Sequence, residues 1–350
     1  MKRISKLLTL AILSGLFLNS CSSDDDIVDP VDPQPEEGAY ADGFFVLNEG
    51  SSGGGSVSFI NNDLQNIEPE IFQTVNEGED VGLYTQSIFF NDEQAFIISN
   101  GSNLISVVDR YTFELIGKIE NDLNIPMYGA VENGKAYVTN LASFDTDTDD
   151  FVAVINLETL EVEETIVMNA TAEYILEEDG LLYVKNASYG TGNQISVINP
   201  TTSSIENTYE TNTGLSDFDV QDGFIYALST SKLEKIDIAS GEIVNSIEFA
   251  EGNAGKMDIE DEIIYYTIGS SVYRIGVNDL EAAEDPILDY NVDSSYAVYG
   301  FEVEEGNIYT AEAHPSFTAN GTIRVYTLNG DLSAEFDSGG IGPNGFYFND

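Results

Sequence analysis

Short apolar segments alternate with acidic turns along most of this chain. Three of them, residues 128–138 (YGAVENGKAYV), 218–227 (FDVQDGFIYA) and 299–309 (YGFEVEEGNIY), share the order strand, glycine turn, strand. Runs rich in β-branched and aromatic residues, bounded by Gly, Asn and Asp, are typical of strands in hairpins. A third apolar strand and a fourth, more polar strand follow, as at 152–156 (VAVIN) and 161–166 (EVEETI). The pattern predicts an all-β chain built from four-stranded repeats.

The spacing of the repeats indicates their architecture. An aromatic residue marks the second strand of the repeats, at Phe96, Tyr137, Tyr183, Tyr226, Tyr265 and Tyr309, with Phe45 or Val46 at the start. Successive gaps of 39 to 51 residues suit the four-stranded blades of a β-propeller. Counting these positions gives seven blades of about 44 residues each over residues 43–350, although six or eight blades are also compatible with the pattern.

The two ends of the repeat region each lack half a repeat. Residues 341–350 (IGPNGFYFND) form one strand after which the sequence stops, and residues 43–48 (GFFVLN) form a second strand without a first. Pairing the two would complete one blade and leave no exposed sheet edge at the junction. We therefore predict a seven-bladed β-propeller closed by the C-terminal strand and the N-terminal blade.

The N-terminus has the features of an export signal. Residues 1–6 are basic and residues 7–18 are apolar, too short a segment to span a bilayer, which needs about 20 residues. The following LNSC sequence, ending at Cys21, resembles a lipobox, so residues 1–20 are predicted to be a lipoprotein signal peptide and Cys21 the lipidated residue. The alternative is an ordinary signal peptide followed by an incidental Cys.

Residues 21–42 are predicted to be the lipidated Cys followed by an acidic, Pro-rich tether. The Asp24-Asp25-Asp26 run resembles the tag that directs lipoproteins of Bacteroidetes to the outer cell surface; the alternative is the solvated start of an acidic linker. The expected location is the outer membrane, lipid-anchored and exposed at the cell surface, with the anchor as the only membrane contact.

Charge excludes one class of partner. Removing residues 1–20 leaves nine of the 12 basic residues against 62 acidic ones, a net charge of −53. Nucleic acid is not an expected partner, because phosphate binding requires clustered Lys and Arg. The chain has one His and one Cys, which leaves little for acid–base or nucleophilic catalysis, so no catalytic residues are expected.

Both ends of the repeat region resemble a known family. Residues 45–50 (FVLNEG), 55–61 (GSVSFIN) and 345–349 (GFYFN) are similar to segments of the seven-bladed, YncE-like propeller lipoproteins of Bacteroidetes. The resemblance implies a protein that captures cobalamin or a ferric siderophore at the cell surface and partners a TonB-dependent outer-membrane transporter. Fold alone does not fix function, so this implication is an analogy.

The expected binding face is the one where the strand-two to strand-three loops meet the connections between blades. Three irregular loops are expected there, at 140–150, 186–193 and 312–321. The candidate ligand-binding residues are Tyr84, Tyr128, Phe144, Tyr174, Tyr189, Lys256, Tyr296, Tyr299, His314 and Phe317. Tyr combines a large stacking area with a polar tip, which suits an amide-rich ligand. The competing interpretation is that many of these rings pack between blades and that His314 is only solvated.

Two further expectations concern metal and ligand charge. Asp145, Asp147 and Asp149 alternate in a way that would suit calcium, although the loop lacks the Gly and closing Glu of an EF-hand and is otherwise read as a solvated acidic tip. The face offers few cations, chiefly Lys232 and Lys256, so a corrinoid-like ligand is expected ahead of an anionic siderophore. The alternatives are a structural or adhesive propeller without a small-molecule ligand and a metal-dependent lactonase.

Overall fold

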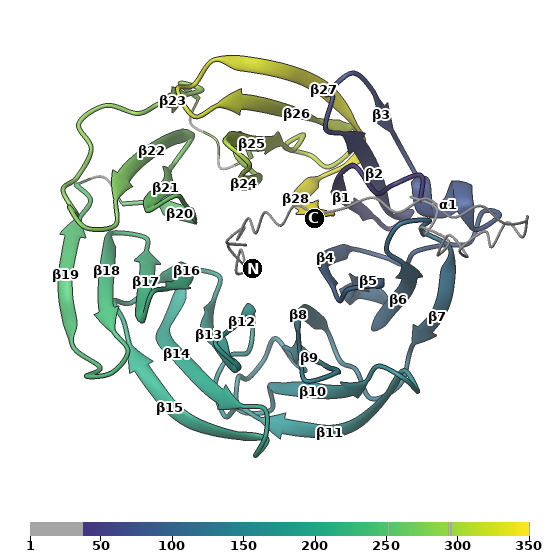
Figure 1. Cartoon of the computed structure of the whole chain (residues 1–350), viewed down its shortest axis with the longest axis horizontal. Helices are drawn as coiled ribbons and strands as arrows, with labels where there is room; N and C mark the ends of the chain where they lie inside the picture. Colours follow the sequence, from purple (N-terminus) through teal and green to yellow (C-terminus); the bar gives the residue numbers. More distant parts are fainter. Residues whose placement is uncertain (1–37, 251, 293, 295, 350) are drawn as a thin grey trace, which may run out of the picture. The chain divides into compact units, whose positions relative to one another are not determined.

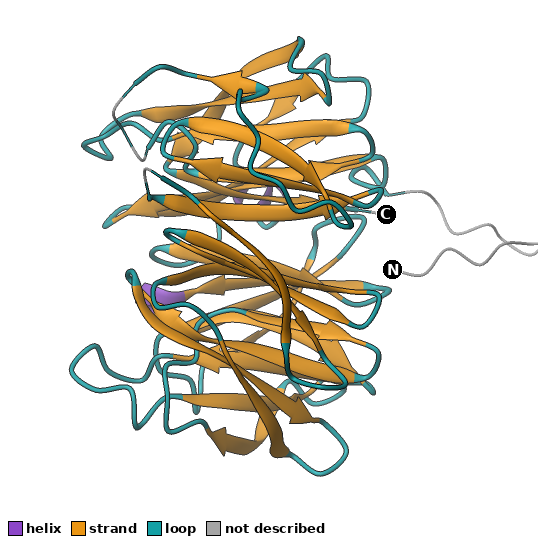
Figure 2. Ribbon diagram, turned by 90° about the vertical axis from the view of Figure 1, so that its left-hand side faces the viewer, coloured by secondary structure: helices purple, strands orange, loops and turns teal. Residues whose placement is uncertain are grey.

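The computed structural model describes residues 38–250, 252–292, 294 and 296–349. These residues form seven antiparallel sheets of four strands each, arranged in a ring around a central axis (Figure 1). The prediction of an all-β, seven-bladed propeller is confirmed, and counts of six and eight blades are excluded. Figure 2 shows the ring edge-on, with the connecting loops gathered at its two faces.

Strands run from the axis outward within each blade. Blade one consists of β28 (Pro343–Phe348), β1 (Gly43–Ser51), β2 (Gly54–Asn61) and β3 (Ile67–Glu68). Blades two, three and four are β4 (Thr85–Phe90), β5 (Gln94–Ser99), β6 (Leu104–Asp109) and β7 (Leu115–Ile119); β8 (Pro126–Glu132), β9 (Lys135–Asn140), β10 (Phe151–Asn156) and β11 (Glu161–Val167); and β12 (Ile175–Glu178), β13 (Leu181–Ser188), β14 (Thr191–Asn199) and β15 (Ser204–Glu210).

The remaining blades repeat the same order. Blades five, six and seven are β16 (Leu215–Gln221), β17 (Phe224–Ser229), β18 (Lys232–Asp237) and β19 (Ile243–Glu248); β20 (Ala254–Glu260), β21 (Ile263–Ile268), β22 (Ser271–Gly276) and β23 (Leu288–Asp289); and β24 (Gly300–Glu304), β25 (Asn307–Glu312), β26 (Asn320–Thr327) and β27 (Leu332–Ile341). Two short helical segments lie between strands, α1 (Ile71–Val75) and η1 (Asn100–Ser102), and neither was predicted.

The repeat pattern explains how the blades form and pack. The predicted aromatic residues all lie buried on second strands, where they fill the space between neighbouring blades. Gly134 and Gly223 occupy the first hairpin turns with φ of +73° and +81°, a conformation that side chains with a Cβ rarely adopt. The local sequence therefore sets both the tight inner turns and the apolar faces.

The ring closes as predicted, through β28 and β1. Phe44 lies opposite Phe348 and Val46 opposite Phe346 in an antiparallel ladder. Asn349 then holds the end of the strand: its Nδ2 donates to the Tyr40 carbonyl at 2.6 Å, and its Oδ1 accepts from Arg110 Nε. Closure thus combines backbone pairing with a buried polar clasp to blade two.

The structure differs from the sequence-based expectation at the 186–193 loop and at the start of the propeller. Residues 186–193, expected to be an irregular loop, instead extend β13 and β14 around a two-residue turn at Tyr189 and Gly190. Tyr40, which the sequence analysis assigned to the tether, is buried, and its ring centroid lies 5.0 Å from that of Phe59. The part of the chain that packs on the propeller therefore begins before residue 43.

The signal peptide, Cys21 and the tether to residue 37 lie outside the described residues. Within the described ranges, no helix has the length and apolar character needed to cross a bilayer.

Candidate functional site

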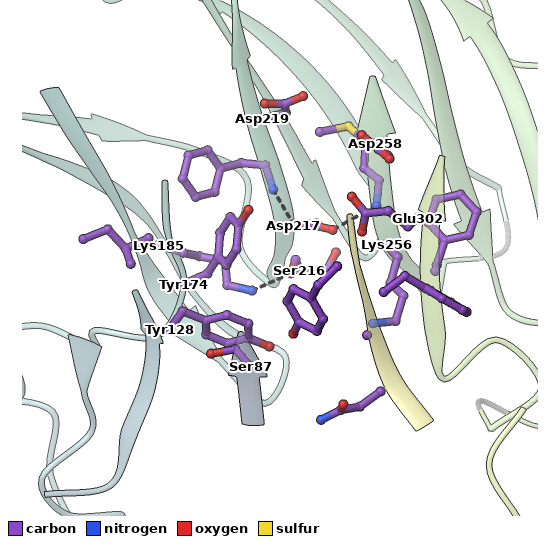
Figure 3. A pocket seen from close by; sticks show the side chains of 18 of the residues that line it. Ser87, Tyr128, Tyr174, Lys185, Ser216, Asp217, Asp219, Lys256, Asp258 and Glu302 are labelled. Atoms are coloured by element: carbon purple, nitrogen blue, oxygen red, sulfur yellow. Dashed lines mark hydrogen bonds between the residues drawn. The ribbon is translucent and has the colours of Figure 1, made fainter. Parts of the chain in front are cut away.

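A cavity of about 420 Å³ lies at the axis of the ring and is lined by innermost-strand residues from all seven blades. Figure 3 shows how its walls differ around the axis. Blades three and four contribute the aromatic side chains Tyr128 and Tyr174. Blades five, six and seven contribute four carboxylates, namely Asp217 and Asp219 on β16, Asp258 on β20 and Glu302 on β24. The cavity therefore has an aromatic side and an acidic side.

Three of these carboxylates occupy the same position in successive blades. Asp219, Asp258 and Glu302 each stand three residues before the first residue of the strand-one to strand-two turn, at Asp222, Asp261 and Glu305. Blades that repeat the same hairpin bring equivalent residues to the same height along the axis. We call these three side chains the acidic layer.

Two of these carboxylates also form hydrogen bonds that connect neighbouring blades. Asp217 Oδ2 accepts from the Met257 amide at 2.9 Å, and Asp258 Oδ2 accepts from the Val303 amide at 2.6 Å. Each bond satisfies a backbone donor on the innermost strand of the next blade, whose axial edge has no further strand beside it. Within the described ranges, the Glu302 carboxylate has no hydrogen-bond partner.

The enclosed setting changes the protonation of the acidic layer. Burial away from water raises the pKa of both Asp219 and Asp258 to about 7, although backbone hydrogen bonds oppose the shift. Burial also raises the pKa of Glu302 well above its ordinary value, and the neighbouring Asp258 and Asp217 add to the effect. These side chains are half-buried rather than sealed, because they face the cavity. The layer therefore carries fewer charges at neutral pH than its composition suggests.

Two lysines line the same cavity, and they differ in their partners. Lys185 Nζ forms an ion pair with Glu173 at 2.8 Å and donates to the Ser216 carbonyl at 2.7 Å. The Lys256 ammonium makes no ion pair or hydrogen bond with any described residue, and burial lowers its pKa while Asp217 opposes that shift. Lys256 is thus the cation at the cavity that remains available to a ligand.

The aromatic side of the cavity is a packed series of rings. Tyr128 and Tyr174 meet edge to face with centroids 5.2 Å apart, and Tyr174 meets Phe218 in the same way at 5.7 Å. The Tyr128 hydroxyl accepts from Gln86 Nε2 at 3.0 Å. Edge-to-face contacts hold these rings in place while leaving part of each exposed to the cavity.

A second hollow, of about 920 Å³, lies at the loop face over blades six and seven. Gly255 and Lys256 line both this hollow and the axial cavity. Tyr296 lines the second hollow, and its ring packs against Phe317 with centroids 5.7 Å apart. The two hollows therefore meet at Lys256.

The ten predicted ligand-binding residues separate into groups. Tyr128, Tyr174 and Lys256 line the axial cavity, and Tyr296, Tyr299 and Phe317 form one aromatic cluster by the second hollow. The Tyr299 hydroxyl donates to the Glu49 carboxylate on blade one. His314 is exposed in the loop beside this cluster, and its Nδ1 lies 3.0 Å from the Ser316 hydroxyl.

The other three predicted residues lie elsewhere on the loop face. Phe144 and Tyr189 are 69% and 78% exposed and contact each other edge to face at 6.3 Å. Tyr84 is 42% exposed and its ring packs over Gly101. Among the described residues, no ring contact joins these three to the blade-seven cluster. The predicted residues thus form separate contact points rather than one continuous surface.

The acidic loop remains only a candidate for calcium. Asp145, Asp147 and Asp149 are exposed at its tip, and the described residues contain no group of three or more His, Cys, Asp or Glu side chains arranged to hold a metal ion. The next residue, Asp150, is instead buried, and its Oδ2 accepts from the Ala172 amide at 3.0 Å. The calcium prediction stays a prediction.

Sequence reasoning missed the acidic layer, Asp217 and Lys185. A signal was present, because an acidic residue recurs three positions before the first turn of three consecutive repeats. It was hidden in a chain with 62 acidic residues, where acidic turns occur in every blade. Only the ring arrangement distinguishes carboxylates that face the axis from those that face solvent.

Comparison with known proteins agrees with this architecture. The sequence model of a domain of unknown function, DUF5074, matches residues 42–324. No curated protein matches the sequence. Among solved structures, a quinonprotein alcohol dehydrogenase-like protein from Bacteroides thetaiotaomicron superposes with a TM-score of 0.69 at 14% identity, covering 89% of this chain and 79% of that one. The hydrazine synthase of Kuenenia stuttgartiensis superposes with a TM-score of 0.57 at 17% identity, covering 74% and 87%. At these identities the likeness shows the fold alone.

Proposed function

The chain belongs to the DUF5074 domain family, and from that premise we propose that its propeller binds a small molecule at the axial cavity and the loop face around it. The observation that carries the proposal is the junction of two hollows at Lys256, with aromatic rings on both. Concave sites with apolar walls and a few convergent polar groups are where small ligands usually bind. Rigid blades would hold these groups in place without a ligand.

Charge and size favour one kind of ligand within this proposal. The net charge of −53 that remains without residues 1–20 would repel an anionic ferric catecholate, whereas a corrinoid presents many amides and no large net charge. A corrinoid is larger than the axial cavity, so it would lie across the loop face against the exposed rings of Phe144 and Tyr189 and the partly buried ring of Tyr296. A corrinoid-like ligand is therefore proposed ahead of a siderophore.

The proposal also includes a cellular role, which is the capture of the ligand at the outer cell surface. Lipidation at Cys21 would tether the propeller to the outer membrane, and the acidic run after it would place the protein at the cell surface. A binding protein in that position would pass its ligand to a TonB-dependent transporter. The support for this step is the N-terminal sequence pattern and the resemblance of the repeat ends to surface propeller lipoproteins.

Titration tests the ligand directly. Purified residues 38–350 would be titrated calorimetrically with cobalamin and with a ferric catecholate, and repeated with the variants Tyr189→Ala, Phe144→Ala and Tyr296→Ala. We expect cobalamin to bind and each variant to weaken binding at least about fivefold, because aromatic contacts at interfaces commonly contribute more than about 1 kcal/mol.

The matched control is Ile243→Ala, which removes an exposed apolar side chain from the outer edge of blade five. This variant should bind like the unmodified protein. Tight catecholate binding without a cobalamin signal would reverse the ligand ranking. Cobalamin binding that is unchanged in all three aromatic variants would place the site elsewhere.

A further inference from the structure

The two sides of the axial cavity differ in what they offer a ligand. The acidic side, on blades five to seven, presents the acidic layer, and the opposite side presents the rings of Tyr128 and Tyr174 (Figure 3). Tyr347 on β28 also lines the cavity. Lys185 is already paired with Glu173, and the charge of Lys256 is balanced chiefly by Asp217. Lys256 also interacts electrostatically with Glu302, more weakly than with Asp217, but among the described residues no ion pair joins a lysine or arginine to the acidic layer.

Hydrogen bonds to the backbone of the next blade account for only some of the carboxylates that face the cavity. Asp258 accepts a backbone hydrogen bond from the next blade, as Asp217 does, so these two have a structural role. Within the described ranges, Asp219 Oδ1 accepts only from the adjacent Val220 amide, and the Glu302 carboxylate has no hydrogen-bond partner. A carboxylate enclosed by protein without a hydrogen-bond donor is costly unless something else supplies one.

A second acceptor lies in the lining of the same cavity, at Asn344 on the innermost strand of the blade next to that of Glu302. Asn344 on β28 donates through Nδ2 to the Thr85 and Gln86 carbonyls, at 3.0 and 3.3 Å. These bonds fix the orientation of the amide, and its Oδ1 is left buried with no donor. The Glu302 carboxylate therefore faces the cavity without a donor, and Asn344 in the same lining holds a second acceptor that has no donor among the described residues. Such a cavity is complementary to a ligand group that donates hydrogen bonds.

From this arrangement we propose that the axial cavity takes a protonated amine, or another organic cation, attached to an apolar or aromatic body. The cation would lie against Glu302 and Asp219, and the body would lie against the tyrosine rings, whose faces attract cations and pack against apolar groups. The proposal rests on the binding function proposed above and specifies which chemical group of a ligand enters the axis.

A probe series with one body and three charges tests the proposal. Calorimetry would compare 4-phenylbutylamine, which is protonated at pH 7.5, with neutral 4-phenylbutanol and anionic 4-phenylbutyrate. We expect the amine to bind at least about tenfold more tightly than the alcohol, since a charge-assisted hydrogen bond adds roughly that factor, and the acid to bind weakest. Equal binding of amine and alcohol, or no detectable amine binding, would overturn the proposal.

Two variants test whether Glu302 binds the amine or only contributes to the stability of the fold. Glu302→Gln keeps the shape of the side chain and should weaken the amine about tenfold while leaving the alcohol unchanged. Glu158→Gln, at an exposed turn of blade three, is the matched control and should change neither probe. A Glu302→Gln variant that melts higher than the unmodified protein yet binds the amine equally well would assign Glu302 a structural role and overturn the proposal.

The two proposals fail in different ways. Loss of the cobalamin signal in all titrations, with the charge order of the phenylbutyl series intact, would refute the corrinoid and leave the amine site standing. Cobalamin binding that depends on the loop-face rings, together with an amine no better than the alcohol, would refute the amine site alone.

Discussion

Removal of the closing strand is the sharpest test of how this propeller holds together. A variant ending at Gly342 would lose all of β28 and the Asn349 clasp. The deletion uncovers β1, where Phe44 and Val46 are fully buried in the intact ring. It also removes Phe346 and Phe348, whose rings pack on Phe44 at 6.2 and 5.4 Å.

The expected loss exceeds what a single domain of this kind can tolerate. Truncating one buried Phe to Ala typically costs about 3–5 kcal/mol. The five residue pairs between β1 and β28 add backbone hydrogen bonds, each worth about 0.5–1.5 kcal/mol net. Typical domain stabilities are about 5–15 kcal/mol, so the sum approaches or exceeds the whole. We therefore expect the truncated chain to aggregate or to populate an open ring.

The assay combines size-exclusion chromatography with light scattering, circular dichroism and thermal melting. The single variant Phe346→Ala gives a graded version and should lower the unfolding free energy by about 3–5 kcal/mol. Leu332→Ala, on the outermost strand of blade seven and 55% exposed, is the control and should change it by less than about 0.5 kcal/mol. A monomeric truncated protein with an unchanged melting temperature would refute the closure argument.

Two further predictions concern the membrane anchor and the acidic layer. Cys21→Ala should release the protein from the membrane fraction, whereas replacing Asp24, Asp25 and Asp26 with Asn should leave it lipidated but protected from external protease; unchanged protease access in that triple variant would remove the surface-tag argument. Because the pKa values of Asp219 and Asp258 are raised from about 4 to about 7, the folded state binds more protons than the unfolded state between these values, and stability should fall as the pH rises through this window. The midpoint of urea unfolding, measured from pH 4.5 to 8, should fall less steeply with rising pH for Asp219→Asn than for the unmodified protein. Asp285→Asn, at an exposed position, is the control and should behave like the unmodified protein. Parallel curves for all three proteins would contradict the burial assigned to Asp219.

Local sequence was sufficient for the architecture. Hairpin turns such as those at Gly134 and Gly223 set strand pairs, aromatic residues at a period near 44 residues set blade faces, and the unpaired strands at 43–48 and 341–350 set the closure. Each of these features is decided by neighbours within one repeat or by a strand with an obvious missing partner. The short helix α1 between blades one and two escaped prediction, since five residues carry too little periodicity to be recognised.

The residues of the candidate site come together only when the seven blades form the closed ring. Asp219, Asp258 and Glu302 are separated by 39 and 44 residues, and each looks like one more acid beside an acidic turn. Closure into seven blades places them at one height around an axial cavity, where burial rather than sequence context sets their protonation. The sequence by itself determined that four-stranded hairpin repeats would form and that the two ends of the repeat region would pair, because strand pairing depends on local periodicity. Only the tertiary structure decided which side chains share the axis, because that depends on the angle at which separate blades meet.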